Sequence, residues 1–131
     1  MKLENRVVII AGANSGVGKA TAKRFSEAGA KVVLVGRSVP RLEGIAKEAG
    51  LEAGRWIGVD TDLTKEDGAQ MVIKKALDKF GQADILFNFV GGWLGGEPVW
   101  ETPAEKMETM IQNHIWSSFF LTKVFSQHFL T

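Results

Sequence analysis

Residues 7–19 of the chain, from Val7 to Lys19, read VVIIAGANSGVGK. The first five residues form a continuously apolar run rich in β-branched side chains, which is typical of a strand buried on both faces of a parallel sheet. Glycines follow directly, and from Val17 onward apolar residues recur at helical spacing until Gly29. The segment therefore predicts a strand, a glycine-rich turn and a helix in immediate succession.

The alternation of strand and helix continues along the rest of the chain. Further strands are expected at 31–35, 55–59 and 84–89, and helices at 38–49, 64–80 and from 102 toward 129. Ser38, Thr64 and Thr102 are predicted to cap these helices, and Thr102-Pro103-Ala104-Glu105 has the pattern of a capping box with proline at the first helical position. Right-handed crossovers then predict a parallel sheet of strand order 3-2-1-4 with helices on both faces.

Length and composition predict a single α/β domain over residues 1–131. Of the 131 residues 45% are hydrophobic, and 16 basic residues nearly balance 15 acidic ones. This balance predicts no nucleic-acid or membrane partner, and no apolar run approaches the roughly 20 residues of a membrane span. No cysteine is present, and His114 and His128 make a poor metal set, so we expect no metal site. We expect a soluble, cytoplasmic protein.

Gly12, Gly16 and Gly18 lie between the first predicted strand and the first predicted helix. In this position glycines permit a tight turn and let backbone N–H groups approach a pyrophosphate at the positive end of the helix dipole. A plain glycine-rich turn is the alternative. A P-loop of the NTPase type is not supported, because Ala13 stands where that motif needs glycine and Ala20 where it needs Ser or Thr.

The spacing Gly-x-x-x-Gly-x-Gly resembles that of the short-chain dehydrogenase/reductases, and the resemblance extends over the whole chain. Asp62-Leu63-Thr64 is similar to the family's Asp-Val-Thr segment, whose carboxylate contacts the adenine. Asn88-Phe89-Val90-Gly91 is similar to the family's Asn-Asn-Ala-Gly segment but departs from it at two of four positions, and Asp84 fits an acidic position upstream. Each match alone has a simpler alternative, such as a helix cap or a turn residue at the end of a strand.

The resemblance implies a Rossmann-type doubly wound parallel sheet that binds a nicotinamide cofactor. Asn113 falls where the family places the asparagine of its Asn-Ser-Tyr-Lys tetrad, which implies a catalytic role in holding a water of a proton relay. His114 beside it is interpreted as a packed or half-exposed residue. The implied cofactor-binding residues are Gly12, Asn14, Ser15, Gly16, Val17, Gly18, Arg37, Ser38, Asp62, Leu63, Asn88, Val90 and Gly91.

The end of the second predicted strand favours NADP(H) over NAD(H). A Rossmann unit that binds NAD carries Asp or Glu there, roughly 20 residues after the glycines, to accept the ribose hydroxyls. Here the position is Gly36, followed by Arg37 and Ser38. A guanidinium can bind a 2′-phosphate bidentately where a carboxylate would repel it, and Ser15 can add a hydroxyl contact. The alternative is that Arg37 is a solvated loop cation.

The family's chemistry also needs a serine on a fifth strand, a tyrosine acid/base and a lysine four residues after it. This chain contains no tyrosine and stops at Thr131, before a fifth strand is expected. We therefore expect the C-terminally incomplete, cofactor-binding half of an NADP(H)-dependent oxidoreductase acting on a small carbonyl/alcohol pair, inactive by itself. The alternative is a non-catalytic nucleotide-binding or oligomerisation module. The broad apolar surface of the last helix predicts a homo-oligomer through that helix.

Overall fold

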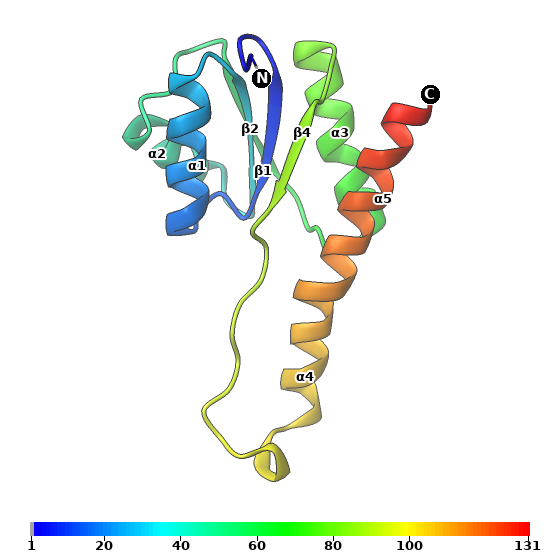
Figure 1. Cartoon of the computed structure of the whole chain (residues 1–131). Coiled ribbons are helices and arrows are strands. Elements are labelled where there is room, and N and C mark those ends of the chain that lie inside the picture. The colour runs from blue at the N-terminus through cyan, green and yellow to red at the C-terminus, as the bar shows by residue number, and fades with distance from the viewer. Residues whose placement is uncertain (1) are drawn as a thin grey trace.

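Four parallel strands form the centre of the computed structural model, which describes residues 2–131 (Figure 1). The strands are β1 (Val7–Ala11), β2 (Lys31–Gly36), β3 (Trp56–Asp60) and β4 (Ile85–Asn88). They lie in the order β3-β2-β1-β4, and Val8 of β1 is opposite Val32 on one side and Ile85 on the other. The predicted strands, their parallel direction and their order are confirmed, and their boundaries shift by one residue at most.

Helices cover both faces of the sheet because alternate strand residues point to opposite sides. The helices that cover it are α1 (Gly16–Glu27), α2 (Val39–Glu48), α3 (Glu66–Phe80) and α5 (Ser117–Leu130). The even-numbered residues of β1 and β2 pack under α1 and α2, and the odd-numbered residues pack under α3 and α5. The predicted doubly wound α/β architecture is confirmed. None of the helices within residues 2–131 combines the length and apolar character needed to cross a membrane.

The three predicted helix caps all differ from the structure, and the first two are at Ser38 and Thr64. Ser38 stands at the N-cap position of α2, but its side chain makes no capping hydrogen bond within residues 2–131. The prediction that Thr64 caps α3 is wrong, because that helix begins at Glu66 with Lys65 at the N-cap position. Asp62 Oδ1 accepts hydrogen bonds from the Thr64 backbone N–H at 3.0 Å and from its hydroxyl at 2.6 Å. The Thr64 hydroxyl is thus engaged in a local turn before the helix begins.

The predicted capping box at Thr102 is also wrong. α4 (Ala104–Ile111) begins after Pro103, one residue later than expected. The Thr102 hydroxyl donates to the carbonyl of Pro98 at 3.0 Å, and this carbonyl precedes the short 3₁₀ turn Val99–Glu101. The competing turn therefore takes the hydroxyl that would have capped the helix.

Between α4 and α5 the chain forms a π turn over Gln112–Trp116, which was not predicted from the sequence. Such turns interrupt the regular helical hydrogen-bond pattern and occur often at functional sites. Ser117 Oγ donates to the carbonyl of Asn113, and Ser118 Oγ donates to the carbonyl of His114 at 2.6 Å. The two serine hydroxyls thus bind backbone carbonyls of the π turn.

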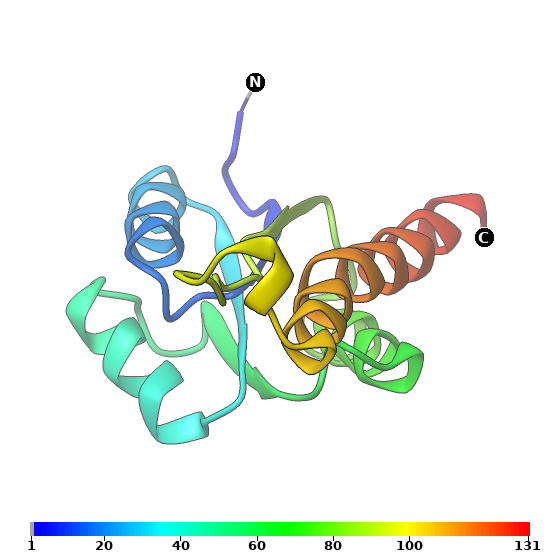
Figure 2. The ribbon, with the colours of Figure 1, turned by 90° about the horizontal axis from the view of Figure 1, so that it is seen from below.

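Residues 91–111, here called the arm, project beyond the carboxyl ends of the strands (Figures 1 and 2). The arm contains an irregular loop, the 3₁₀ turn and α4. Lys106 of α4 ties the loop back to the helix, because its Nζ lies 2.5 Å from Glu97 Oε1. This hydrogen bond holds the pKa of the Glu97 carboxyl below its usual value.

Candidate functional site

A groove of about 490 Å³ lies at the carboxyl ends of the strands, the side from which Figure 2 is viewed. In open parallel sheets ligands bind at this edge, at the point where strand order reverses, which here is between β1 and β4. The groove brings together the predicted site residues Gly12, Asn14, Ser15, Arg37, Leu63, Val90, Gly91 and Asn113.

The glycine turn between β1 and α1 gives each of its glycines a different environment. Gly12 has a φ of +73°, and a Cβ there would lie 2.6 Å from the carbonyl carbon of Phe89. A Cβ on Gly18 would lie 2.7 Å from the Gly12 carbonyl oxygen, so both glycines permit close backbone packing. Around Gly16, beyond its own helix and chain neighbours, no heavy atom of the described chain lies within 4 Å of a Cβ. Gly16 therefore faces open space at the start of α1.

Ser15 organises the amino-terminal end of α1. Its hydroxyl accepts the Gly18 N–H at 2.9 Å and donates to the Gly12 carbonyl at 3.0 Å. The N–H groups in the first turn of a helix have no partner within that helix, and the dipole gives this end a partial positive charge. Asn14 and Ser15 line the groove beside this helix end, so the local structure suits an anion such as a pyrophosphate.

Arg37 and Arg41 make one side of the groove cationic. The Arg37 side chain is 70% exposed, and its Nη2 lies 3.3 Å from Asp62 Oδ1. Hydrogen bonds from the hydroxyl and the backbone N–H of Thr64 hold the pKa of Asp62 below its usual value against desolvation, and the charges of Arg37 and Lys65 lower it further. Asp62 is therefore ionised at neutral pH and offsets part of the positive charge of Arg37.

Asn88, at the end of β4, supports the groove from outside its lining. Its Oδ1 accepts the Val90 N–H at 3.0 Å, and its Nδ2 donates to Ser118 Oγ at 2.9 Å, 30 residues further along the chain. These bonds fix the turn that places Val90 and Gly91 in the groove lining. Asn88 thus joins this side of the groove to α5.

Asn113 lies in the π turn and lines the groove. The residue is half-buried, and its carbonyl accepts a hydrogen bond from the buried Ser117 hydroxyl. A π turn changes the direction of the side chains that follow it relative to a continuous α-helix. Helical periodicity in the sequence therefore could not place Asn113 and His114 relative to the groove.

The remaining predicted site residues lie beside the groove. Gly16, Val17 and Gly18 form the first turn of α1, Ser38 precedes α2, and Asp62 and Asn88 shape the loops after β3 and β4. Asp84 lies at the opposite end of β4, where its carboxylate accepts a hydrogen bond from Arg6 at 2.9 Å and from the Val7 N–H at 2.8 Å. Asp84 therefore joins the beginnings of β1 and β4.

Several groove residues were not predicted as site residues, namely Val35, Gly36, Arg41, Thr61, Thr64 and Phe89. Arg41 is the most informative of them, because it adds a second guanidinium. It follows Arg37 by four residues, within the first turn of α2. One arginine before the predicted helix start and one after it were the sequence signal that could have identified the cationic side of the groove.

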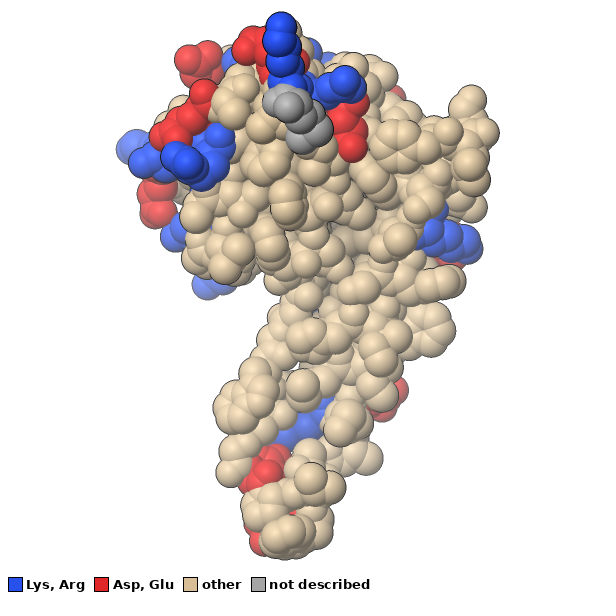
Figure 3. Space-filling view, viewed as in Figure 1, with Lys and Arg blue, Asp and Glu red and all other residues tan. Residues whose placement is uncertain are grey.

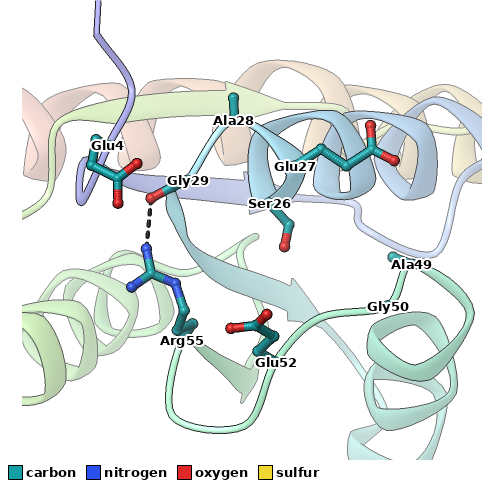
Figure 4. Close-up of a pocket in the computed structure, with 9 residues that line it drawn as sticks. All are labelled: Glu4, Ser26, Glu27, Ala28, Gly29, Ala49, Gly50, Glu52 and Arg55. Carbon is teal, nitrogen blue, oxygen red and sulfur yellow. Dashed lines mark hydrogen bonds between the residues drawn. The ribbon is translucent and has the colours of Figure 1, made fainter.

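A second hollow, of about 610 Å³, lies at the opposite ends of the strands, next to the carboxyl-terminal ends of α1 and α2 (Figure 4). Arg55 donates to the Gly29 carbonyl at 2.6 Å and to Asn5 Oδ1 at 3.3 Å, which ties the start of β3 to the turn before β2. Three glutamates also line it. No group of three or more His, Cys, Asp or Glu arranged to hold a metal occurs among the described residues, these glutamates included.

Comparison with known proteins identifies the family. The sequence profile described as short chain dehydrogenase matches residues 6–131. The chain therefore belongs to the short chain dehydrogenase family.

Three similar proteins illustrate the relationship. An uncharacterized oxidoreductase of Listeria monocytogenes is 36% identical over 115 residues, covering 88% of this chain and 46% of the relative. A short chain dehydrogenase of Bacillus anthracis superposes with a TM-score of 0.92 at 30% identity, covering 98% of this chain and 53% of the other. A 3-ketoacyl-(acyl-carrier-protein) reductase of Brucella melitensis, complexed with NADH, superposes with a TM-score of 0.88 at 33% identity. The superposition covers 97% of this chain and 51% of the reductase. The chain spans about half the length of the curated relatives it matches.

Proposed function

We propose that this chain is the cofactor-binding half of an NADP(H)-dependent oxidoreductase that acts on a small carbonyl or alcohol substrate. The observation that carries the proposal is the groove, in which the glycine turn and two arginines face one space at the carboxyl edge of the sheet. The NADH complex of the Brucella melitensis reductase supports a nicotinamide cofactor, and its name supports a carbonyl substrate.

The groove residues fit a nicotinamide dinucleotide. The first turn of α1 would hold the pyrophosphate, because Gly16 leaves space for close approach and the helix end favours an anion. Leu63 and the Asp62 turn would border the adenine, and Gly91 and Asn113 would border the nicotinamide. When bound, the nicotinamide supplies or accepts a hydride.

The preference for NADP(H) rests on the cationic side of the groove. Gly36 stands at the end of β2, where a carboxylate would otherwise accept the ribose hydroxyls. Arg37 and Arg41 flank the start of α2, and a guanidinium forms charge-assisted hydrogen bonds with a phosphate. A 2′-phosphate would compete with Asp62 for Arg37. Because that ion pair is widely exposed, breaking it costs little free energy.

Asn113 is the residue of this chain that we propose for the chemical step, through its position in the π turn at the groove. An amide holds and orients a water but does not exchange protons near neutral pH, so the proton donor has to come from another group. We further propose that the exposed apolar surface of the last helix contacts a second copy of the chain.

A direct binding measurement tests the proposal. Addition of NADPH to the chain should quench tryptophan fluorescence saturably, and an excess of NADP should reverse the effect. Gly16→Ala should weaken the binding while the far-ultraviolet circular dichroism stays unchanged. Absence of saturable binding of both NADPH and NADH at millimolar concentration would contradict the proposed function.

A further inference from the structure

His114 makes a close contact with the loop that follows β4. Its Nε2 lies 2.6 Å from the Gly92 carbonyl oxygen and 3.3 Å from the Gly92 nitrogen. One ring nitrogen cannot donate and accept at once, and the shorter distance assigns Nε2 as the protonated nitrogen that donates to the carbonyl. The ring also fills the space next to Gly91, where a Cβ would lie 2.7 Å from His114 Cε1.

The backbone of His114 belongs to a second set of hydrogen bonds with the same loop. Its carbonyl accepts from Ser118 Oγ at 2.6 Å, and that hydroxyl accepts from Asn88 Nδ2 at 2.9 Å. Asn88 Oδ1 in turn accepts from the Val90 N–H at 3.0 Å. The π turn is therefore joined to residues 88–92 through both the side chain and the backbone of His114.

We propose that His114 is a positioning residue that fixes the cofactor-facing backbone of Val90 and Gly91 relative to Asn113. This inference rests on the proposed function, because it assigns the contact to the cofactor end of the groove. His114 is exposed, so burial in a core does not orient its ring. The ring is oriented by its hydrogen bond and by its packing on Gly91. A residue that tethers a loop in this way reduces the conformational freedom that a ligand would otherwise have to remove.

The position of Gly91 explains why a ring and a glycine occur together here. Gly91 and Asn113 both line the groove, and the His114 ring lies against Gly91. Any side chain at position 91 would collide with the ring at its present place. The two residues therefore form a matched pair, and a change in one is expected to alter the effect of a change in the other.

The test separates the hydrogen bond from the ring. His114→Phe keeps a ring without a donor, and His114→Gln places an amide nitrogen close to the position of Nε2. We expect NADPH affinity, measured by calorimetry, to fall about fivefold in His114→Phe, the effect of one lost hydrogen bond, and to return to within about twofold in His114→Gln. His128→Ala, which removes the other histidine near the end of α5, is the matched control and should bind NADPH unchanged. Hydrogen exchange of residues 90–92 should quicken only in His114→Phe.

A double-mutant cycle gives a second readout that needs no ligand. Gly91→Ala should lower the midpoint of urea unfolding in the wild-type background and should do so much less in the His114→Ala background. Wild-type affinity and exchange rates in His114→Phe, or additive effects in the cycle, would overturn the assignment to His114 while leaving the proposed function intact. Failure of the wild-type chain to bind either NADPH or NADH would overturn both.

Discussion

The Arg37 guanidinium and the Asp62 carboxylate form an ion pair with an Nη2–Oδ1 distance of 3.3 Å across the ends of β2 and β3. The two side chains are 70% and 46% exposed, and pairs of this kind contribute little to stability. The pair instead sets the charge at one end of the groove. Asp62 partly neutralises the cation that we assign to the 2′-phosphate.

Removing the carboxylate charge should therefore increase the preference for NADPH over NADH. Because hydrogen bonds from Thr64 hold the pKa of Asp62 below its usual value, Asp62→Asn removes a full negative charge at neutral pH. One charge at a solvated site changes the binding free energy of an anion by about 1 kcal/mol, or about fivefold in affinity. Parallel titrations with NADPH and NADH measure this, and a lower preference in Asp62→Asn would show that the carboxylate does not oppose the phosphate.

The glycines of the turn should separate into structural and ligand-facing positions. Gly18→Ala would place a Cβ 2.7 Å from the Gly12 carbonyl, which is expected to cost about 1–3 kcal/mol of unfolding free energy. Gly16→Ala meets open space and should retain wild-type stability, but should weaken nucleotide binding about tenfold by obstructing the phosphate, a loss of about 1.4 kcal/mol.

Urea unfolding and cofactor titration on the same preparations distinguish the two effects. Equal destabilisation by the two substitutions would contradict the packing found at Gly18. Unaltered binding in a fully folded Gly16→Ala variant would mean that the pyrophosphate does not lie at this turn.

The chain should self-associate at micromolar concentration. Exposed apolar side chains extend along α4, the π turn and α5, including Ile115 at 59% and Phe119 at 52% exposure. Figure 3 shows mostly uncharged surface between the arm and the carboxyl-terminal end of the chain, although the arm itself carries acidic and basic groups, and β4 lies at the edge of the described sheet. Exposed apolar patches and open strand edges both favour association.

Sedimentation velocity measures this association. The double variant Ile115→Lys/Phe119→Lys should shift the chain toward monomer, whereas Met71→Lys, an exposed apolar position on α3, should leave the distribution unchanged. A wild-type chain that sediments as a stable monomer and binds no hydrophobic dye would refute the prediction.

The 131-residue chain should show no reductase turnover. It contains no tyrosine, and a positioned general acid contributes roughly 10²–10⁴-fold to such a reaction. NADPH oxidation is followed at 340 nm with a panel of aldehydes and ketones, with Gly16→Ala prepared in parallel to reveal contaminating enzymes. Turnover in the wild type that is lost in Gly16→Ala would contradict the prediction.

Elements buried on both faces were predictable from the sequence, because their apolar runs admit few alternatives. Val7–Ala11 is fully buried as expected, and the strand order follows from handed crossovers. Helix starts were less predictable, because the Thr64 and Thr102 hydroxyls bind competing local partners. The glycine turn and Arg37 could be placed at the groove since they follow neighbouring parallel strands.

The contacts of the π turn were not predictable in the same way. An apolar helix with many aromatic residues carries no pattern that marks a single irregular turn. The contact of His114 with Gly91 and Gly92 depends on that turn and on a distant loop, because His114 and Gly92 are 22 residues apart in the chain. Such a contact becomes visible only in three dimensions.

Cofactor discrimination at Arg37 is the most direct test of the account. Calorimetric titration of the wild-type chain with NADPH and NADH should show tighter binding of NADPH. Arg37→Ala should reduce the NADPH affinity about ten- to a hundredfold, because this is the loss expected for one charge-assisted phosphate contact. The same substitution should have little effect on the NADH affinity. Arg24→Ala, which removes an exposed guanidinium from α1, should change neither affinity. Equal affinities of the wild-type chain for the two cofactors, or an Arg37→Ala variant that retains its NADPH affinity, would contradict the assignment of this groove to NADP(H).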